Sequence, residues 1–444
     1  MSQVGPSIES TGLLGEELLE AWAFLSTGER VEGFRLLPPD EAEEFFVSLA
    51  GRDQADLLAA LGRAERQIWL RQLAPDDAAD VVQASSEAAR EDLLALLDEV
   101  TRKEVAALLA YAEDDAGGLM SPRFARVRPD MRVDEAIAYL RRQARERLET
   151  IYYIYVLDGE QRLLGVVSFR DLFGAPADRT VREVMQSDPI RVPEDLDQES
   201  VSQLIAEHDL MAMPVVDADG RMKGIITVDD IVDVVQEEAT EDIQKLGGTA
   251  ALDAPYLDVG VAEMVRKRGG WLLVLFVGQL FTATAMAHYE TELARALVLA
   301  LFLPLVISSG GNSGSQASTL VIRAITLGEV KLRDWWRVLR REIASGLALG
   351  TLLGVFGVLR IVLWPSSEQA YGPHYGLVGL AVGFSLVGIV LWGAVAGAML
   401  PFLLRRLGLD PAAASAPFVA TLVDVTGLMI YFNVAAIVLG GTLL

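Results

Sequence analysis

One acidic residue interrupts a long apolar stretch near the C-terminus. Residues 412–442 contain Asp424 but no Lys, Arg or His that could pair with it. A charged group at the centre of a membrane costs about 3 kcal/mol on insertion scales, and such groups are usually functional. Small or polar residues recur around it at steps of three and four, which places them on one helix face: Pro417, Ala420, Thr421, Asp424 and Gly427. We therefore expect Asp424 to line an ion pathway, and a protonated structural carboxyl group is the alternative.

A second polar run lies in an earlier apolar stretch, where residues 308–316 read Ser-Ser-Gly-Gly-Asn-Ser-Gly-Ser-Gln. Three glycines weaken a helix, so we expect this run to expose backbone carbonyls. Such backbone is tolerated at membrane depth only where it is buried in protein or lines a watery cavity. Close helix packing through small residues is the alternative. It explains the glycines well, but Asn312 and Gln316 poorly.

A single mid-span Asp is too little to hold an ion within one subunit. Two chains around a twofold axis would bring two Asp424 carboxylates together. Mg²⁺ keeps several waters and is usually bound through one or two carboxylates. We therefore predict a dimeric pore with Asp424 at its neck. Asp410, which follows Arg405 and Arg406, is a weaker candidate, because Asp before Pro411 is also a good helix start.

The charge is distributed very unevenly along the 444 residues. Residues 1–250 hold 51 of the 62 acidic and 25 of the 38 basic residues, a net charge of −26, whereas residues 251–444 have a net charge of +2. The acidic half excludes nucleic acid as a partner and favours cations. With no cysteine in the chain, oxygen ligands and hard cations are expected. The three histidines are scattered and no nucleophile–base pair is evident, so we do not expect an enzyme.

Five apolar stretches in the second half are long enough to cross a lipid bilayer as helices: 270–288, 293–326, 343–364, 376–403 and 412–442. Lys and Arg gather before the first stretch, between the second and third, and after the fourth, and they are missing from loops 288–292 and 365–375. By the positive-inside rule the N-terminal half is cytoplasmic and the C-terminus lies outside. The polar N-terminus does not resemble a cleaved signal peptide. We expect a multi-pass protein of the plasma (inner) membrane.

Residues 18–118 have helical periodicity and an internal repeat. The motif Leu-Pro-Pro-Asp-Glu at residue 37 recurs as Leu-Ala-Pro-Asp-Asp at residue 73, an offset of 36 residues. A two-helix unit of that length, stacked on its neighbours, predicts a small α-solenoid. Pro and acids suit the first turn of a helix, so these carboxylates need only stabilise helix starts.

Residues 119–236 contain a second repeat, of strands alternating with helices. One copy ends Gly165-Val-Val-Ser-Phe-Arg-Asp171 and the other Gly224-Ile-Ile-Thr-Val-Asp-Asp230. This ending, present twice, resembles the cystathionine-β-synthase (CBS) domain pair, a regulatory module. The resemblance implies candidate contacts to adenosine ribose and phosphate, which makes ATP a candidate modulator: Ser168, Asp171, Thr227 and Asp230. Helix capping by the same residues is the alternative.

The whole series of segments resembles the MgtE family of magnesium channels. The series comprises the solenoid at 18–118, the CBS pair at 119–236, an acidic connecting helix at 237–268, and the membrane domain at 269–444. Its most specific motifs are Gly-Gly-Asn-x-Gly-x-Gln from residue 310 and Ala-Thr-x-x-Asp-Val-Thr-Gly from residue 420. The expected fold is thus multi-domain: an all-α superhelical N-domain, an α+β CBS pair and a polytopic α-helical membrane domain with five spans.

The resemblance also implies the site residues and partners. It implies a homodimer with its pore on the dimer axis, and Mg²⁺ as both substrate and regulator. The candidate pore residues are Ser308, Gly311, Asn312, Ala420, Thr421 and Asp424. The candidate sensor residues are Glu44, Asp76, Asp80, Asp209, Asp230, Asp233, Glu238, Glu241, Asp242 and Asp410. Ser315 and Ala416 stand where relatives are expected to carry pore-facing Asn.

Electrostatics suggests how such a sensor would work. Clustered carboxylates repel one another at low Mg²⁺, and divalent cations between them would remove the repulsion and favour closure of the pore. The alternative function is a secondary transporter that couples divalent cations to H⁺ or Na⁺. Such a transporter would be expected to show inverted repeats and several intramembrane ionisable groups, and the sequence shows neither.

Overall fold

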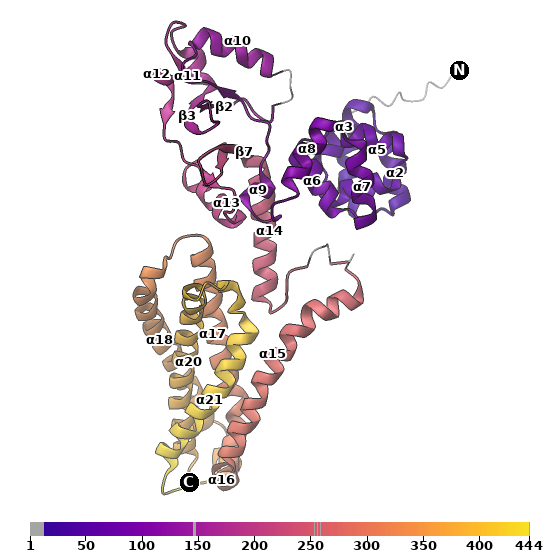
Figure 1. The fold of residues 1–444 in the computed structure, drawn as a ribbon. Coiled ribbons are helices and arrows are strands. Elements are labelled where there is room, and N and C mark those ends of the chain that lie inside the picture. The colour runs from indigo at the N-terminus through magenta and orange to yellow at the C-terminus, as the bar shows by residue number, and fades with distance from the viewer. Residues whose placement is uncertain (1–12, 145–147, 253, 255, 258, 444) are drawn as a thin grey trace, which may run out of the picture. The chain divides into compact units, whose positions relative to one another are not determined.

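The computed structural model describes residues 13–144, 148–252, 254, 256–257 and 259–443 (Figure 1). The chain divides into two compact units, Met1–Val235 and Gln236–Leu444. The first unit carries the solenoid and the CBS pair, and the second carries the apolar helices.

The solenoid is built from helices of about ten residues whose starts are spaced regularly. From Thr27 to Glu99 a new helix begins every twelve residues. The helices are α1 (Leu13–Ala21), the short 3-10 helix η1 (Trp22–Phe24), α2 (Thr27–Leu36), α3 (Pro39–Ser48), α4 (Gly51–Ala60), α5 (Arg63–Leu70), α6 (Pro75–Ala84), α7 (Glu87–Leu96) and α8 (Glu99–Leu108). The expected two-helix unit is therefore wrong, because helices this short place three in each 36-residue repeat. The predicted role of Pro is confirmed, since Pro39 and Pro75 open α3 and α6 with acids in the first turn.

Alternate helices of the solenoid pack on one another, so that α2, α4, α6 and α8 form one layer. Aromatic side chains hold the layers together at the N-terminal end. Phe34 packs edge-on against Trp69 with ring centroids 4.9 Å apart, and Phe46 lies 5.6 Å from the same indole. This core places the first turn of α6, with its acidic pair, at a fixed position in the first unit.

The CBS pair contains two small sheets of the same design. The elements in chain order are α9 (Ala116–Leu119), β1 (Arg126–Val127), α10 (Val133–Gln143), β2 (Tyr153–Leu157), β3 (Leu163–Ser168), α11 (Phe169–Gly174), α12 (Val181–Val184), β4 (Gln186–Ser187), β5 (Val192–Pro193), α13 (Gln198–Glu207), β6 (Ala212–Val216), β7 (Met222–Thr227) and α14 (Val228–Leu246). The strand orders are β1-β2-β3-β4 and β5-β6-β7, with a parallel first pair followed by an antiparallel one in each sheet.

Each sheet of the pair is completed by the segment that opens the other repeat. Strand β4, which opens the second copy, pairs with β3 of the first. Ser121, which opens the first copy, exchanges backbone hydrogen bonds of 2.7 and 2.9 Å with Ile225 of β7. This exchange ties the two CBS domains together and fixes the start of α14, which directly follows β7.

The second unit contains five helices that are long and apolar enough to span a membrane, among the residues that the structure describes. The elements are α15 (Val261–His288), α16 (Glu290–Arg295), η2 (Leu297–Phe302), α17 (Leu303–Thr326), η3 (Leu332–Asp334), α18 (Trp335–Val362), α19 (Ser367–Tyr371), α20 (Tyr375–Arg406), η4 (Pro411–Ala413) and α21 (Ala416–Leu439). The five predicted spans are confirmed, and the core of this unit lies among α17, α20 and α21.

Two expectations about helices need correction. The glycine-rich run lies within an unbroken helix, α17, and does not interrupt it, because tight packing against neighbours outweighs the low helix propensity of glycine. The connecting helix is also shorter than predicted. It begins at Val228 as the last helix of the second CBS domain and ends at Leu246, and the next helix begins at Val261. The described residues between 246 and 261 are not helical.

Candidate functional site

The polar stripe of α17 faces the stripe of small and polar residues on α21 that contains Asp424. Ser308, Gly311, Asn312 and Ser315 recur at helical steps and share one face of α17. A Cβ atom placed on Gly311 would lie 3.5 Å from the Ala420 Cβ and 3.9 Å from the Asp424 Oδ1. One turn further along α17, Ser315 Oγ donates a hydrogen bond of 3.1 Å to the Ala416 carbonyl. The two predicted motifs, about 110 residues apart in the chain, therefore meet.

Close packing by other glycines brings these stripes together. Gly310 and Gly314 are buried on the opposite side of α17, where the backbone touches Gly393 and Gly397 of α20. A Cβ on either α20 glycine would overlap a carbonyl oxygen of α17. The packing alternative thus holds for Gly310 and Gly314, whereas Gly311 is the glycine that faces Asp424.

The carboxylate of Asp424 accepts a hydrogen bond from a third helix. Gln279 of α15 donates from Nε2 to Asp424 Oδ2 at 3.1 Å. The sequence reasoning missed this residue, although an amide within the apolar stretch 270–288 was a signal that could have been followed. Thr421 lies beside this contact. Its hydroxyl donates to the Pro417 carbonyl at 2.9 Å, and a Cβ on Gly278 of α15 would lie 2.9 Å from its methyl group.

Ser308 and Asn312 are exposed in the single chain. They lie on the same face of α17 as Gly311, so an ion beside Asp424 would also face their side chains. Asp424, Gly311 and Ala420 form the part of the predicted pore that one chain brings together.

A second group of acids lies in the same unit, around Lys245 of α14. Its ammonium contacts Glu241 at 2.6 Å and Asp410 at 2.7 Å. Asp410 also accepts a hydrogen bond of 2.8 Å from the Ala412 backbone N–H at the start of η4. The helix-start interpretation of this residue is therefore confirmed, and its place beneath the pore stays a prediction. Burial and the Asp410 charge raise the pKa of Asp242, which accepts a hydrogen bond of 3.3 Å from Thr326. We call Glu241, Asp242, Asp410 and Lys245 the lysine-centred group.

A third group of acids lies in the first unit, where three segments meet. We call its members the acidic cluster: Asp76 and Asp77 of α6, Glu149 before β2, and Asp229 and Asp230 of α14. The negative charge of other cluster members raises the pKa of Asp76, of Asp77 and of Glu149. The solenoid, the first CBS domain and the second CBS domain thus all contribute negative charge to one place.

Burial makes this repulsion costly. Asp76 is only 7% exposed, and its Oδ1 atom has no hydrogen-bond partner among the described residues. Burial, followed by the charges of Glu149, Asp77 and Asp230, raises its pKa well above the usual range. Burial and neighbouring acids also raise the pKa of Asp77 to about 6. Burial also raises the pKa of Asp230 to about 6, although two hydrogen bonds from Thr227 lower it.

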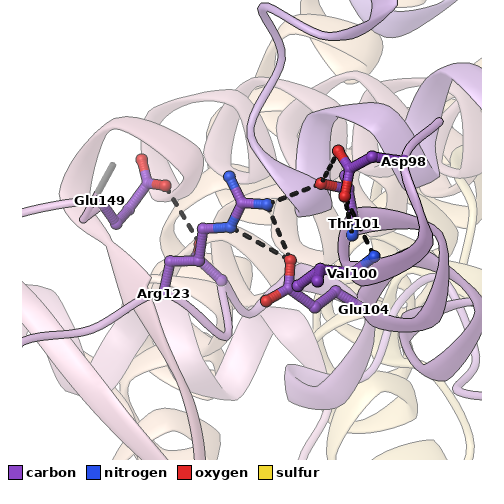
Figure 2. A network of polar contacts seen from close by, with 7 residues as sticks. Asp98, Val100, Thr101, Glu104, Arg123 and Glu149 are labelled. Atoms are coloured by element: carbon purple, nitrogen blue, oxygen red, sulfur yellow. Dashed lines mark hydrogen bonds and ion pairs between the residues drawn. The ribbon is translucent and has the colours of Figure 1, made fainter. Parts of the chain in front are cut away.

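Among the described residues, Arg123 borders the acidic cluster, and its side chain makes its hydrogen bonds to the solenoid. Arg123 contacts Glu104 of α8 at 2.8 Å and donates to Thr101 at 2.9 Å (Figure 2). Its charge lowers the pKa of Glu149, but less than burial and the neighbouring acids raise it. Arg123 therefore joins the solenoid to the first CBS domain without neutralising the cluster.

Comparison with known proteins decides the family. Residues 303–434 match the divalent cation transporter family MgtE, residues 16–114 match the MgtE intracellular N domain, and residues 116–178 and 181–237 match the CBS domain. The chain is 45% identical over 343 residues to the magnesium transporter MgtE of Thermus thermophilus, covering 77% of this chain and 74% of that protein. It is 33% identical over 333 residues to MgtE of Enterococcus faecalis, covering 75% and 71%. The chain belongs to the MgtE family of magnesium transporters.

Among solved structures, the cytosolic domain of the Mg²⁺ channel MgtE in complex with ATP is 42% identical, with a TM-score of 0.47. It covers 50% of this chain and 93% of that one. As an MgtE protein, this chain is a multi-pass membrane protein with a soluble N-terminal part. Membership in a transporter family agrees with the expectation that it is not an enzyme.

The MgtE resemblance named ten sensor residues, and the structure groups only some of them. Asp76 and Asp230 lie in the acidic cluster, where the charge of Asp233 also raises the pKa of Asp77. Glu241, Asp242 and Asp410 lie in the lysine-centred group. Glu44 and Asp209 are exposed and belong to neither group. Asp80 lies on α6 one turn after Asp76, and Glu238 on α14 one turn before Asp242, and their part in an MgtE sensor stays a prediction.

Asp77, Glu149 and Asp229 were missed. Asp77 and Asp229 are sequence neighbours of predicted residues, so the acidic pairs themselves were the signal. Glu149 belongs to no motif. Within the described part of the chain, no three acids or histidines lie close enough together to hold one metal ion.

The candidate nucleotide residues cap helices. Ser168 Oγ lies 2.6 Å from Asp171 Oδ2 and accepts from the Asp171 backbone N–H at 3.0 Å, at the start of α11. Thr227 repeats the pairing with Asp230 at 2.6 Å, at the start of α14. The capping alternative accounts for both pairs, and adenine nucleotide binding stays a prediction.

Proposed function

We propose that this MgtE protein is a Mg²⁺ channel of the plasma (inner) membrane, formed by two copies with Asp424 at the neck of the pore. The observation that carries the proposal is the meeting of Asp424 with Gly311 of α17 inside the membrane unit. Its neighbours there are a glycine, an alanine and an amide, so the described contacts leave its charge unneutralised. A twofold axis beside these stripes would bring two such carboxylates to one hydrated ion.

The proposed orientation places the soluble unit in the cytoplasm and the C-terminus outside. Lys and Arg distribution supports it. The contacts between α15 and α21 agree with five alternating spans, because the first and fifth spans must then run in the same direction. Trp271 contacts Ser415 near their starts, and Tyr289 contacts Asn433 near their ends.

The proposed regulation is closure by cytoplasmic Mg²⁺. The acidic cluster joins three segments that repel one another, and its buried Asp76 oxygen has no donor in the described residues. A hydrated divalent cation there would supply both positive charge and hydrogen-bond donors. Because the ligand binds better to the assembled cluster than to separated acids, it shifts the equilibrium toward the assembled state. The sensed ion is then the transported ion, which gives negative feedback.

The test of the pore is Asp424→Asn, which keeps the shape and one oxygen but removes the charge. We expect Mg²⁺ uptake into proteoliposomes to fall at least tenfold, about 1.4 kcal/mol, with dimer content by crosslinking unchanged. The matched control is Glu342→Gln, which removes an acid of α18 whose hydrogen bond goes to Ser345 of its own helix. Near-normal uptake by Asp424→Asn would remove Asp424 from the pore.

Two further measurements test the transport mechanism and the binding of ATP. Single-channel current steps would establish a channel, whereas strict dependence of uptake on a H⁺ or Na⁺ gradient would establish the secondary transporter. Equilibrium dialysis of the full chain with ATP, at low and high Mg²⁺, tests the nucleotide prediction for Ser168 and Thr227.

A further inference from the structure

The third span, α18, begins with a basic segment. Residues 331–342 contain five bases and two acids, in a chain whose net charge is −24. Three of these bases recur at steps of four and three, which places them on one side of η3 and α18: Arg333, Arg337 and Arg340. All three are exposed, and the side chain of Arg337 is 85% exposed. We call these three residues the arginine stripe.

The arginine stripe faces away from the rest of the second unit. On the opposite side of α18, a Cβ atom on Gly346 would lie 3.1 Å from the Leu391 Cα atom of α20, and one on Gly350 would lie 2.9 Å from the Val387 Cα atom. Val338 lies about two turns before Gly346 on this packed side, and it contacts an apolar cluster formed by α17 and α20. Since a helix turns by about 100° per residue, the arginine stripe lies on the side of α18 that α20 leaves uncovered.

The uncharged part of α18 matches the thickness of a membrane. Residues 343–359 contain no charged side chain and extend for about 26 Å at 1.5 Å per residue, against a hydrocarbon core of about 30 Å. Exposed apolar side chains continue along this run, among them Leu347, Leu352 and Phe356. Trp336, which is 51% exposed, lies just before it, at the depth where Trp is enriched in membrane proteins. The arginine stripe is therefore at the level of the lipid headgroups, and the helix beyond it lies against acyl chains.

The arginines of the stripe have few acceptors within the protein. Asp334 lies 3.4 Å from Arg337, and it also accepts a hydrogen bond of 3.2 Å from the Lys331 backbone N–H. Within the described part of the chain, Arg333 and Arg340 form no ion pair. An arginine side chain offers five N–H donors in a planar fork whose geometry matches phosphate. Two of the three guanidinium groups are thus available to an external anion.

We propose that the arginine stripe is a binding site for an anionic phospholipid. The guanidinium groups hold the headgroup phosphate, and the acyl chains lie along the exposed apolar surface of α18. A zwitterionic lipid carries the same phosphate, but its ammonium group is repelled by the three bases. A small soluble phosphate leaves the apolar surface without a partner. The inference goes beyond the proposed function and does not depend on the role of Asp424.

The experiment measures lipid binding by the full-length protein in detergent, using native mass spectrometry. The probes are phosphatidylglycerol, which is anionic, and phosphatidylcholine, which is zwitterionic, with the same acyl chains. Each base near an anionic lipid surface contributes about a factor of five, so three bases should favour phosphatidylglycerol by up to roughly a hundredfold. The variant with Arg333→Gln, Arg337→Gln and Arg340→Gln should bind the two lipids with equal affinity.

Two control variants separate charge from other effects. The variant with Arg333→Lys, Arg337→Lys and Arg340→Lys keeps the positive charge and should keep a preference for phosphatidylglycerol. Arg102→Gln removes an exposed base of the solenoid helix α8 and should leave the affinities for both lipids at the wild-type values. Phosphatidylcholine should bind all variants equally, which shows that the surface of α18 is intact.

Four results would overturn the proposal. The wild type could bind both lipids equally, or the triple Gln variant could keep the wild-type preference. The triple Lys variant could lose the preference as completely as the triple Gln variant, which would show that charge does not recognise the lipid. Glycerol 3-phosphate could displace phosphatidylglycerol at equal concentration, which would identify a site for soluble phosphates.

Discussion

The carboxylates of the two units have different surroundings. In the first unit, buried acids from three segments face other acids, and Arg123, whose charge acts on Glu149, is paired with Glu104. In the second unit, the functional candidates each have a donor. Asp424 has Gln279, Asp242 has Thr326, and Asp410 shares Lys245 with Glu241.

The difference shows how similar residues can serve different purposes. A group of acids that repel one another, with no cation among them, holds unfavourable energy that an external cation can release, which is the requirement for a sensor. An acid with one donor is oriented, which is the requirement for a conduction site or a fixed joint. Lys245 acts within the second unit as a built-in cation where the first unit has none among its cluster residues.

The largest effect is expected from neutralising two acids of the acidic cluster. Asp76→Asn with Asp230→Asn removes two of its charges and two candidate ligands. The Mg²⁺ concentration at the midpoint of protection of α6 from hydrogen exchange, in the full-length protein, should then rise more than about tenfold, since a divalent ion loses charge-assisted contacts worth about 1.5–3 kcal/mol each. The control is Glu91→Gln, which removes an exposed acid of the same solenoid outside the cluster. An unchanged midpoint in the double variant would dissociate Mg²⁺ sensing from this cluster.

A second prediction concerns the dependence of folding stability on pH. The pKa of Asp77 is about 6 in the folded protein, against an ordinary value of 3.8. Between these two values the folded state binds more protons than the unfolded state, so stability falls as pH rises through this window. Above about pH 6 the full penalty applies, about 2 kcal/mol for a shift of this size in a partly exposed site. Without Mg²⁺, protection of α6 from hydrogen exchange should therefore be higher at pH 5 than at pH 7.5.

Asp77→Asn isolates this contribution from the other titrating groups of the chain. It should flatten the difference between pH 5 and pH 7.5, and added Mg²⁺ should flatten it in the wild type. A pH dependence in Asp77→Asn equal to that of the wild type would mean that the repulsion resides elsewhere.

The sequence was sufficient for features that depend on spacing within one segment. The apolar stretches predicted five spans, the Pro-acid pairs predicted the starts of α3 and α6, and the repeated strand-turn endings predicted the CBS pair. Asp424 could be singled out because a carboxylate in an apolar stretch is energetically costly and is usually functional. Its partner stripe, with Gly311, was identified through the family motif.

Features that arise between segments were not accessible. Gln279 meets Asp424 across 145 residues of chain, and no periodicity records that contact. Glu149 becomes part of the acidic cluster only because the exchanged sheet openings bring it near α6 and α14. The unbroken α17 has the same origin: the propensity of Gly310 and Gly314 argues for a break, and their tight contact with Gly393 and Gly397 determines the outcome. In each case tertiary packing decided what local sequence left open.

The smallest effect is expected from removing the built-in cation. Lys245→Met keeps most of the apolar stem of the side chain but leaves Glu241, Asp242 and Asp410 without the ammonium that now contacts two of them. These three acids would then resemble the acidic cluster of the first unit. They should gain affinity for Mg²⁺, and we expect the midpoint for protection of α14 from hydrogen exchange to move to lower Mg²⁺ by about threefold. The shift is modest because partly exposed ion pairs are worth about 1 kcal/mol or less. Lys331→Met, which removes an exposed ammonium elsewhere in the second unit, is the matched control. If Lys245→Met moved the midpoint to higher Mg²⁺, the lysine would be a joint that helps the Mg²⁺-bound state form, and the contrast between a filled and an unfilled acidic group would fail for the second unit.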